Sequence, residues 1–230
     1  MTIKRVTILG ERCSGTNFLE NAITSNFDVH VTWDFGWKHF WGHHAYANSD
    51  DVLFVGIVRD PVEWMNSLFR TPYHLNPAMR KSVDAFLNNE CWSLYDNKRL
   101  HGARYGTEIM QDRNIYAPQQ RYKNIFECRA TKLRFLVDDM PNKVAHYVLI
   151  KYEDLRDDFA HTLDRIKRAG DLKIKQHIAY PIKPLNYKKG KQLYIPNRHE
   201  PKIDRALIIK HTDFDRTYEE RLGYNTFSST

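Results

Sequence analysis

Features that would place a chain outside the ordinary globular proteins are scarce in this sequence. Its 230 residues include only ten glycines and nine prolines, which excludes collagen-like and low-complexity chains. No apolar run approaches the roughly 20 residues that a membrane-spanning helix needs. Cys13, Cys91 and Cys128 are widely spaced and form no Cys-x-x-Cys pair, which indicates reduced thiols and no zinc site. Because the apolar run near the N-terminus is too short for a secretory signal, we expect a cytoplasmic protein.

The composition that is present is typical of a globular protein. Hydrophobic residues make up 42% and charged residues 27%, so we expect a single domain spanning residues 1–230. The net charge of +7 is uneven, because residues 121–230 hold 23 basic and 15 acidic side chains. Residues 173–199 hold seven basic residues and no acidic one. This stretch indicates an anionic ligand, although charge alone does not distinguish a nucleic acid from a small phosphate ester.

Strand-like and helix-like segments alternate along the chain. Residues 52–58 form a continuous apolar run, which is typical of a strand buried on both faces of a parallel sheet. Further strands are expected at 3–9, 29–32 and 146–150, and helices at 17–24, from Pro61 onward, and over about 155–169 with Gly170 as C-cap. The alternation predicts an α/β fold, a three-layer sandwich with a central, mostly parallel sheet. Residues 71–145 are less regular, with helical segments expected at 82–90 and 115–139.

The loop after the first strand has a glycine near each end. Residues 10–16 read Gly-x-x-x-x-Gly-Thr, and Thr16 stands where a nucleotide-binding P-loop has the lysine that reaches the β- and γ-phosphates. The two glycines still let the loop curl, so that the N–H groups of residues 14–17 can point at an anion at the helix N-terminus. The loop therefore predicts a phosphate site without a metal-bound triphosphate. The alternative is a tight strand-to-helix turn whose glycines serve only sterics.

A second motif follows the apolar run at 52–58. Arg59 stands at the carboxyl end of this predicted strand, where open parallel sheets bind ligands, and Ser67 follows eight residues later. An arginine beside a phosphate-binding turn is suited to a second phosphate. The alternative for Arg59 is a cap or an ion pair with Asp60 or Glu63.

Together these motifs resemble those of the sulfotransferases that use 3′-phosphoadenosine 5′-phosphosulfate (PAPS), which have a P-loop NTPase-like fold. Ser14-Gly15-Thr16 is similar to their 5′-phosphosulfate loop, and the spacing of Arg59 and Ser67 is similar to their 3′-phosphate motif. Three later segments are also similar: YEDL at 152–155, Tyr187-Lys188-Lys189-Gly190, and YEERLGY at 218–224. The five motifs stand in the family's order and are spread over most of the chain.

The resemblance implies a donor, a reaction and a set of binding residues. The donor is PAPS, the product is adenosine 3′,5′-bisphosphate, and no metal is required. The implied 5′-phosphate residues are Cys13, Ser14, Gly15, Thr16 and Asn17, the implied 3′-phosphate residues are Arg59, Ser67, Lys188, Lys189 and Gly190, and Tyr152 approaches the adenine. Binding of the anionic PAPS would then explain the positive charge of residues 173–199.

Sulfuryl transfer needs cations on the leaving phosphate and the moving group, and a base for the acceptor proton. The family usually has a basic residue directly before Ser-Gly-Thr; Cys13 stands there in this chain, and Arg12 stands one position earlier. Either Arg12 or Lys38 is expected to take that role. Lys38 and His39 resemble the family's lysine-and-histidine segment, and His39 is the expected base. His43, His44 or a glutamate are the alternative bases.

The sequence leaves the acceptor and two rival functions open. Carbohydrate, lipid, small alcohol and peptide tyrosine are all possible acceptors, because residues 71–145, which would form that pocket, match no motif. The aromatic residues Trp33, Trp37, Phe40 and Trp41 either line an acceptor pocket or belong to the core. The rival functions are a P-loop kinase of small molecules and a catalytically degenerate nucleotide-binding relative. A nucleic-acid partner and a membrane span are not expected.

Overall fold

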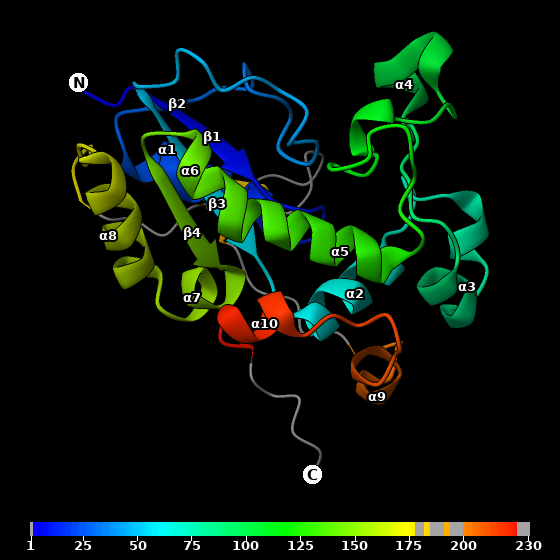
Figure 1. The fold of residues 1–230 in the computed structure, drawn as a ribbon. Helices are drawn as coiled ribbons and strands as arrows, with labels where there is room; N and C mark the ends of the chain where they lie inside the picture. The colour runs from blue at the N-terminus through cyan, green and yellow to red at the C-terminus, as the bar shows by residue number, and fades with distance from the viewer. Residues whose placement is uncertain (1, 178–181, 185–190, 194–199, 225–230) are drawn as a thin grey trace. The chain divides into compact units, whose positions relative to one another are not determined.

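The computed structural model describes residues 2–177, 182–184, 191–193 and 200–224 (Figure 1). The chain divides into two compact units, each built from two separate stretches of sequence. The first unit comprises Met1–Asp60 and Leu136–His199, and the second comprises Pro61–Phe135 and Glu200–Thr230.

A four-stranded parallel sheet forms the centre of the first unit. Its strands are β1 (Arg5–Leu9), β2 (His30–Val31), β3 (Val52–Val58) and β4 (Tyr147–Lys151), in the order β2-β1-β3-β4. All three neighbouring pairs are parallel, and every residue of β3 is buried. The strands therefore end at a common carboxyl edge. The prediction of an α/β fold around a parallel sheet is confirmed.

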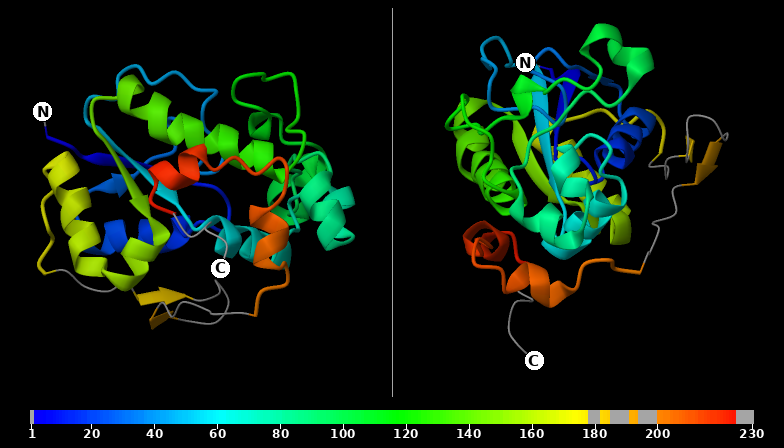
Figure 2. Two further views of the ribbon diagram at one scale, coloured as in Figure 1. Left: turned by 60° about the horizontal axis from the view of Figure 1, so that its bottom comes forward. Right: turned by 90° about the vertical axis from the view of Figure 1, so that its right-hand side faces the viewer.

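Helices α1 (Thr16–Asn26) and α8 (Phe159–Gly170) pack against one face of this sheet. Aliphatic side chains from alternate strand positions meet them there, including Val6, Val55 and Ile150. The opposite face is more aromatic, because Phe54 packs edge-on against Phe35 and Tyr46. The helix α6 (Met140–Lys143) also lies on this side, as Figure 2 shows with the sheet seen nearly edge-on.

The helix expected over 155–169 is in fact two helices. The first, α7 (Tyr152–Asp157), ends at Asp158, whose φ of −133° and ψ of 64° break the helical path before α8. The prediction that Gly170 is the C-cap is wrong, since the left-handed residue is Asp171, with a φ of 45°. Gly170, the last residue of α8, has a packing role instead: a Cβ there would lie 2.9 Å from Leu172 Cδ2 and 3.0 Å from Leu53 Cδ2 of β3. The glycine therefore lets the helix approach the sheet closely.

Two short strands follow α8 in the part of the chain where the sequence indicated only a basic stretch. They are β5 (Ile182–Pro184) and β6 (Lys191–Leu193), and they pair antiparallel. No residue pattern predicted this hairpin.

The second unit is helical, with short segments joined by turns. Its helices are α2 (Pro61–Arg70), η1 (Pro77–Arg80), α3 (Val83–Asn88), α4 (Lys98–His101), η2 (Gly102–Arg104), η3 (Met110–Asp112), α5 (Ile125–Arg134), α9 (Arg205–Ile209) and α10 (Thr217–Arg221). The helix expected at 82–90 corresponds to α3, whereas the one expected at 115–139 begins only after Asn124, which caps α5 through its side chain. A π-helical turn, η4 (Phe135–Asp139), continues α5 toward α6. None of the helices among the described residues is long and apolar enough to cross a membrane.

Candidate functional site

The loop of residues 10–16 lies at the carboxyl edge of the sheet, between β1 and α1. Two of its residues have left-handed backbone conformations, Cys13 with a φ of 67° and Gly15 with a φ of 96°. The Ser14 hydroxyl donates to the Glu11 carbonyl at 2.6 Å, which closes the turn from inside. Gly15 is the N-cap of α1 and brings no side chain over the helix start. The first-turn N–H groups, which have no acceptor within a helix, are thus arranged as donors for an anion.

Gly10 joins this loop to the segment that holds Lys38 and His39. Its N–H donates to the Lys38 carbonyl at 2.9 Å, and its own carbonyl lies 2.6 Å from His39 Nδ1. Because a carbonyl oxygen only accepts, Nδ1 carries the proton, and in the neutral ring Nε2 carries the lone pair. The histidine is also buried, at 8% exposure. The loop therefore fixes both the orientation and the tautomer of His39.

Lys38 lies beside the first turns of α1. Its ammonium group donates to Asn17 Oδ1 at 2.5 Å and to Glu20 Oε2 at 2.8 Å. The same nitrogen lies 5.5 Å from the centre of the Trp33 ring. Sequence reasoning missed Glu20, although its position three residues after Asn17 places both on one face of the helix. This arrangement brings a cation next to the loop and neutralises it with a carboxylate.

Arg12 lies beside the aromatic rings of Trp37 and Phe40. Its guanidinium lies 5.1 Å from the centre of the Trp37 ring and 5.7 Å from that of Phe40. The Trp37 ring in turn packs edge-on against the imidazole of His39, with centroids 4.6 Å apart. Trp33 and Trp37 are partly exposed, at 37% and 39%, whereas Trp41 is fully buried in the core. Of the two alternatives for these tryptophans, Trp41 therefore belongs to the core.

Arg59 and Tyr152 lie against the loop from another direction. Arg59 follows β3, and its guanidinium donates to the Cys13 carbonyl at 3.1 Å. It also stacks over the Tyr152 ring at 4.6 Å. Tyr152 is buried, and a Cβ on Gly15 would come within 2.4 Å of its Cδ2. The two side chains thus support the loop, and the Arg59 guanidinium is a cation just beyond the carboxyl end of β3.

Four further residues belong to the site that the sequence predicts. Ser67 is in α2 and belongs to the second unit. Lys188, Lys189 and Gly190 lie outside the described residues.

Of the alternative bases, His44 packs against the turn at Gly36, where a Cβ would come within 2.8 Å of its ring. Its Nδ1 is buried and makes no hydrogen bond within the described ranges. Nearby, burial raises the pKa of Tyr46 to about 12, so this phenol keeps its proton at neutral pH. Among the residues that the structure covers, no group of three or more His, Cys, Asp or Glu side chains is arranged to hold a metal ion.

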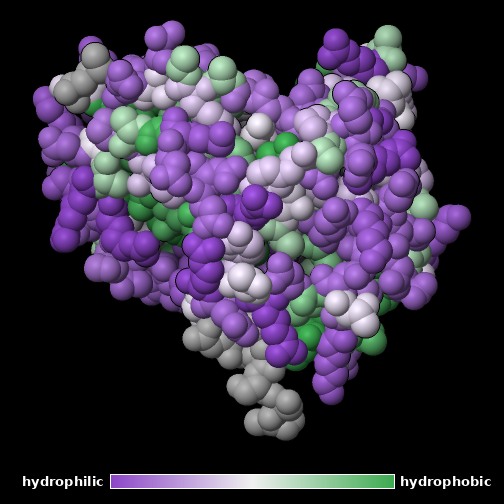
Figure 3. Space-filling model, in the orientation of Figure 1, coloured by the Kyte–Doolittle hydropathy of each residue, from purple (hydrophilic) through white to green (hydrophobic). Residues whose placement is uncertain are grey.

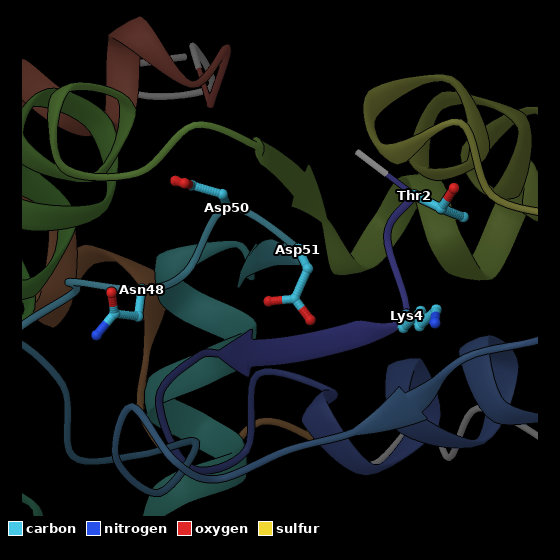
Figure 4. A pocket seen from close by; sticks show the side chains of 5 residues that line it. All are labelled: Thr2, Lys4, Asn48, Asp50 and Asp51. Atoms are coloured by element: carbon cyan, nitrogen blue, oxygen red, sulfur yellow. The ribbon is translucent and has the colours of Figure 1, made fainter.

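An open pocket of about 510 Å³ lies at the opposite, amino end of the strands (Figure 4). It is lined by Thr2, Lys4, Asn48, Asp50 and Asp51. Beside it, the guanidinium of Arg5 hydrogen-bonds Asp51 and lowers the pKa of that carboxyl group. Since open parallel sheets bind their ligands at the carboxyl ends of the strands, the loop of residues 10–16 remains the better candidate site.

No protein-family model matches the chain, and no curated protein matches its sequence. Around the loop in the first unit, the structure brings together these predicted site residues: Arg12, Cys13, Ser14, Gly15, Thr16, Asn17, Lys38, His39, Arg59 and Tyr152.

Proposed function

We propose that this chain is a PAPS-dependent sulfotransferase, which moves a sulfuryl group to a hydroxyl or amine acceptor by in-line transfer. One observation carries the proposal most: the glycine loop at the carboxyl edge is hydrogen-bonded through Gly10 to a buried histidine of defined tautomer. An anion-binding loop coupled directly to a base suits group transfer better than binding alone. The position of the loop between β1 and α1 also favours the finer fold expectation, a P-loop NTPase-like three-layer sandwich.

The donor set at the loop suits the phosphosulfate end of PAPS. The N–H groups of Gly15, Thr16 and Asn17 would hold the 5′-phosphate, with Cys13 turned by its left-handed conformation. Ser14 would shape the loop, because its N–H and its hydroxyl both donate to the Glu11 carbonyl. When bound, PAPS supplies the sulfuryl group on a phosphate that leaves readily. Arg59, placed by its hydrogen bond to Cys13, would bind the 3′-phosphate. Ser67, Lys188, Lys189, Gly190 and the adenine contact of Tyr152 complete the set that the resemblance implies. None of these contacts calls for a metal ion.

The transfer needs one base and two cations, which His39, Lys38 and Arg12 would supply. His39 accepts the acceptor's proton at Nε2, while Gly10 holds the Nδ1 proton in place. Lys38 exchanges its bond to Glu20 for the developing charge, which lies within reach because Asn17 of the loop is already its partner. Arg12 adds positive charge from the side of Trp37. Catalysis thus consists of positioning, charge stabilisation and one proton transfer.

Calorimetric titration tests the donor site. We expect adenosine 3′,5′-bisphosphate to bind at least about tenfold more tightly than 5′-AMP or ATP, with or without magnesium. Arg59→Ala should weaken binding of the bisphosphate more than binding of 5′-AMP, because both nucleotides lose the support that Arg59 gives the loop through Cys13 but only the bisphosphate loses a 3′-phosphate partner. Tighter binding of ATP with magnesium would instead favour the small-molecule kinase, and equal binding of all three nucleotides would refute the donor assignment.

Two substitutions of His39 separate its chemical role from its structural one. In His39→Asn the side-chain amide can still donate to the Gly10 carbonyl, but no basic nitrogen remains at the Nε2 position. We expect this variant to bind the bisphosphate like the wild type and to lose transfer from PAPS to a panel of alcohols, phenols, amines and saccharides. His44→Asn is the control, and it should keep transfer. If the wild type binds the bisphosphate yet transfers to no acceptor, the chain is a degenerate relative.

A further inference from the structure

A closed loop of the second unit, residues 94–108, is ordered by its own hydrogen bonds. Leu94 and Glu108 pair as an antiparallel bridge at its base. Above them, the Tyr95 N–H donates to the Thr107 carbonyl at 3.0 Å, and the Gly106 N–H donates to the Tyr95 carbonyl at 2.8 Å. The loop contains α4 and η2, and Figure 1 draws α4 apart from α2 and α5 of the same unit. Its shape is therefore fixed before any partner arrives.

The tip of this loop exposes apolar and basic side chains together. Leu100 is 76% exposed and Tyr105 is 52% exposed, and no residue of α4 is buried. The basic residues Lys98, Arg99 and Arg104 surround them in sequence, and within the described residues none of the three forms a salt bridge. Asp96 is the one acidic residue between positions 96 and 107. In Figure 3, the surface around α4 is mainly hydrophilic with small paler areas among the charged groups.

We propose that this tip binds the surface of a membrane that contains anionic lipids. Basic side chains near such a surface gain electrostatic attraction to the headgroups, and an exposed leucine gains from entering the acyl boundary. Tyrosine suits the interface between them, because its ring is apolar and its hydroxyl is polar. The loop would act as a peripheral anchor, which requires no membrane-spanning helix.

The shape of the tip favours a lipid surface over a folded protein or a nucleic acid. A Cβ added at Gly102 or Gly106 would meet no atom within 4 Å, so both glycines face open space. Open space at these positions offers no enclosed pocket for a partner's side chain, whereas a fluid bilayer adapts to any shape. An aliphatic residue at the tip has no base-stacking role of the kind that nucleic-acid sites use. The inference does not depend on the proposed sulfotransferase activity.

Vesicle co-sedimentation of the full chain tests the proposal. We expect binding to phosphatidylcholine vesicles that contain about 30% phosphatidylserine, weak binding to pure phosphatidylcholine, and a decrease as salt rises. Leu100→Ser should weaken binding roughly tenfold, because the leucine side chain no longer enters the apolar layer. The triple variant Lys98→Gln, Arg99→Gln, Arg104→Gln should bind more weakly and depend less on salt.

The control is Leu207→Ser, which removes another exposed leucine, 53% exposed, from α9. It should bind vesicles like the wild type, and since both leucines are exposed, neither change should lower the melting temperature appreciably. If Leu100→Ser and Leu207→Ser bind vesicles equally well, the Leu100 side chain makes no contribution of its own to vesicle binding, and the proposal is overturned. So would the absence of phosphatidylserine-dependent binding, or binding to oligonucleotides or acidic peptides that vesicles do not match.

Discussion

At the scale of single residues, two glycines set the geometry of the candidate site. A Cβ on Gly10 would come within 2.6 Å of Ile57 Cγ2 and 2.8 Å of Thr16 Cγ2, both on stiff β-branched side chains. Gly15 combines a positive φ with the close approach of Tyr152. The loop can therefore curl against β3 and α7 only where side chains are missing. The same close packing lets Gly10 reach His39 and the backbone of Lys38 at once.

Replacing Gly15 by alanine should destabilise the chain through two separate effects. A left-handed conformation costs a non-glycine residue roughly 1–2 kcal/mol, and the clash with Tyr152 adds about 1–3 kcal/mol of overpacking. Gly106→Ala is the matched control, because Gly106 has a φ of 80° but open space around the new Cβ. Urea denaturation measures both variants. An equal loss of unfolding free energy in the two would mean that Tyr152 does not press on the loop.

Glu108 should make the second unit sensitive to acid. Its hydrogen bonds to Arg121, and then to Arg113, lower the pKa of this carboxyl group to about 2. In the unfolded chain the pKa returns to about 4.3. The folded state therefore gains stability above that value and loses it as the pH falls toward 2. Denaturation between pH 6 and pH 2.5 should show a smaller acid loss in Glu108→Gln than in the wild type. Glu90→Gln, which removes only an exposed partner of Arg121, should keep the wild-type slope.

At the scale of helices and strands, the sequence predicted those elements whose position depends mainly on residues close together in the chain. The apolar run at 52–58 is β3 residue for residue, since burial on both faces leaves no polar position to blur its ends. The break at Asp158 and the role of Gly170 were missed, because they depend on how α8 meets Leu53 of another element. In the site, the sequence indicated Lys38 and His39. It could not show Glu20 as the partner of Lys38, or Gly10 as that of His39, because these contacts exist only once β1, α1 and the segment after β2 are assembled.

A buried ion pair between Arg129 of α5 and Glu219 of α10 should be needed to hold these two helices together. Both side chains are at most 3% exposed, and the guanidinium of Arg129 also lies over the Trp64 ring. Removing one partner leaves a buried charge, so Glu219→Gln or Arg129→Met should each cost about 3–5 kcal/mol of unfolding free energy. The double variant Arg129→Met, Glu219→Leu should recover much of this loss, because no charge is left buried. Additive losses in the double variant would contradict this account.

At the scale of the whole molecule, the order of the segments links the two units covalently. The chain passes from one unit to the other at residues 60–61, 135–136 and 199–200. The second passage runs through helical backbone, since α5 continues into the π-helical turn Phe135–Asp139. Neither unit is a contiguous stretch that could be cut out. The sequence predicts a single domain over residues 1–230, and this prediction can be tested by the way in which the chain unfolds.

If the chain is one domain, heat or urea should unfold it in a single cooperative transition. Because helical backbone runs across residues 135–136, unfolding of one unit should fray the helix that continues into the other. Calorimetry should then give a van't Hoff enthalpy equal to the measured enthalpy. Gly15→Ala in the first unit and Glu219→Gln in the second make the test sharper, because each should move the whole transition to lower temperature. Two transitions, each moved by only one of these variants, would show instead that the units unfold as independent domains.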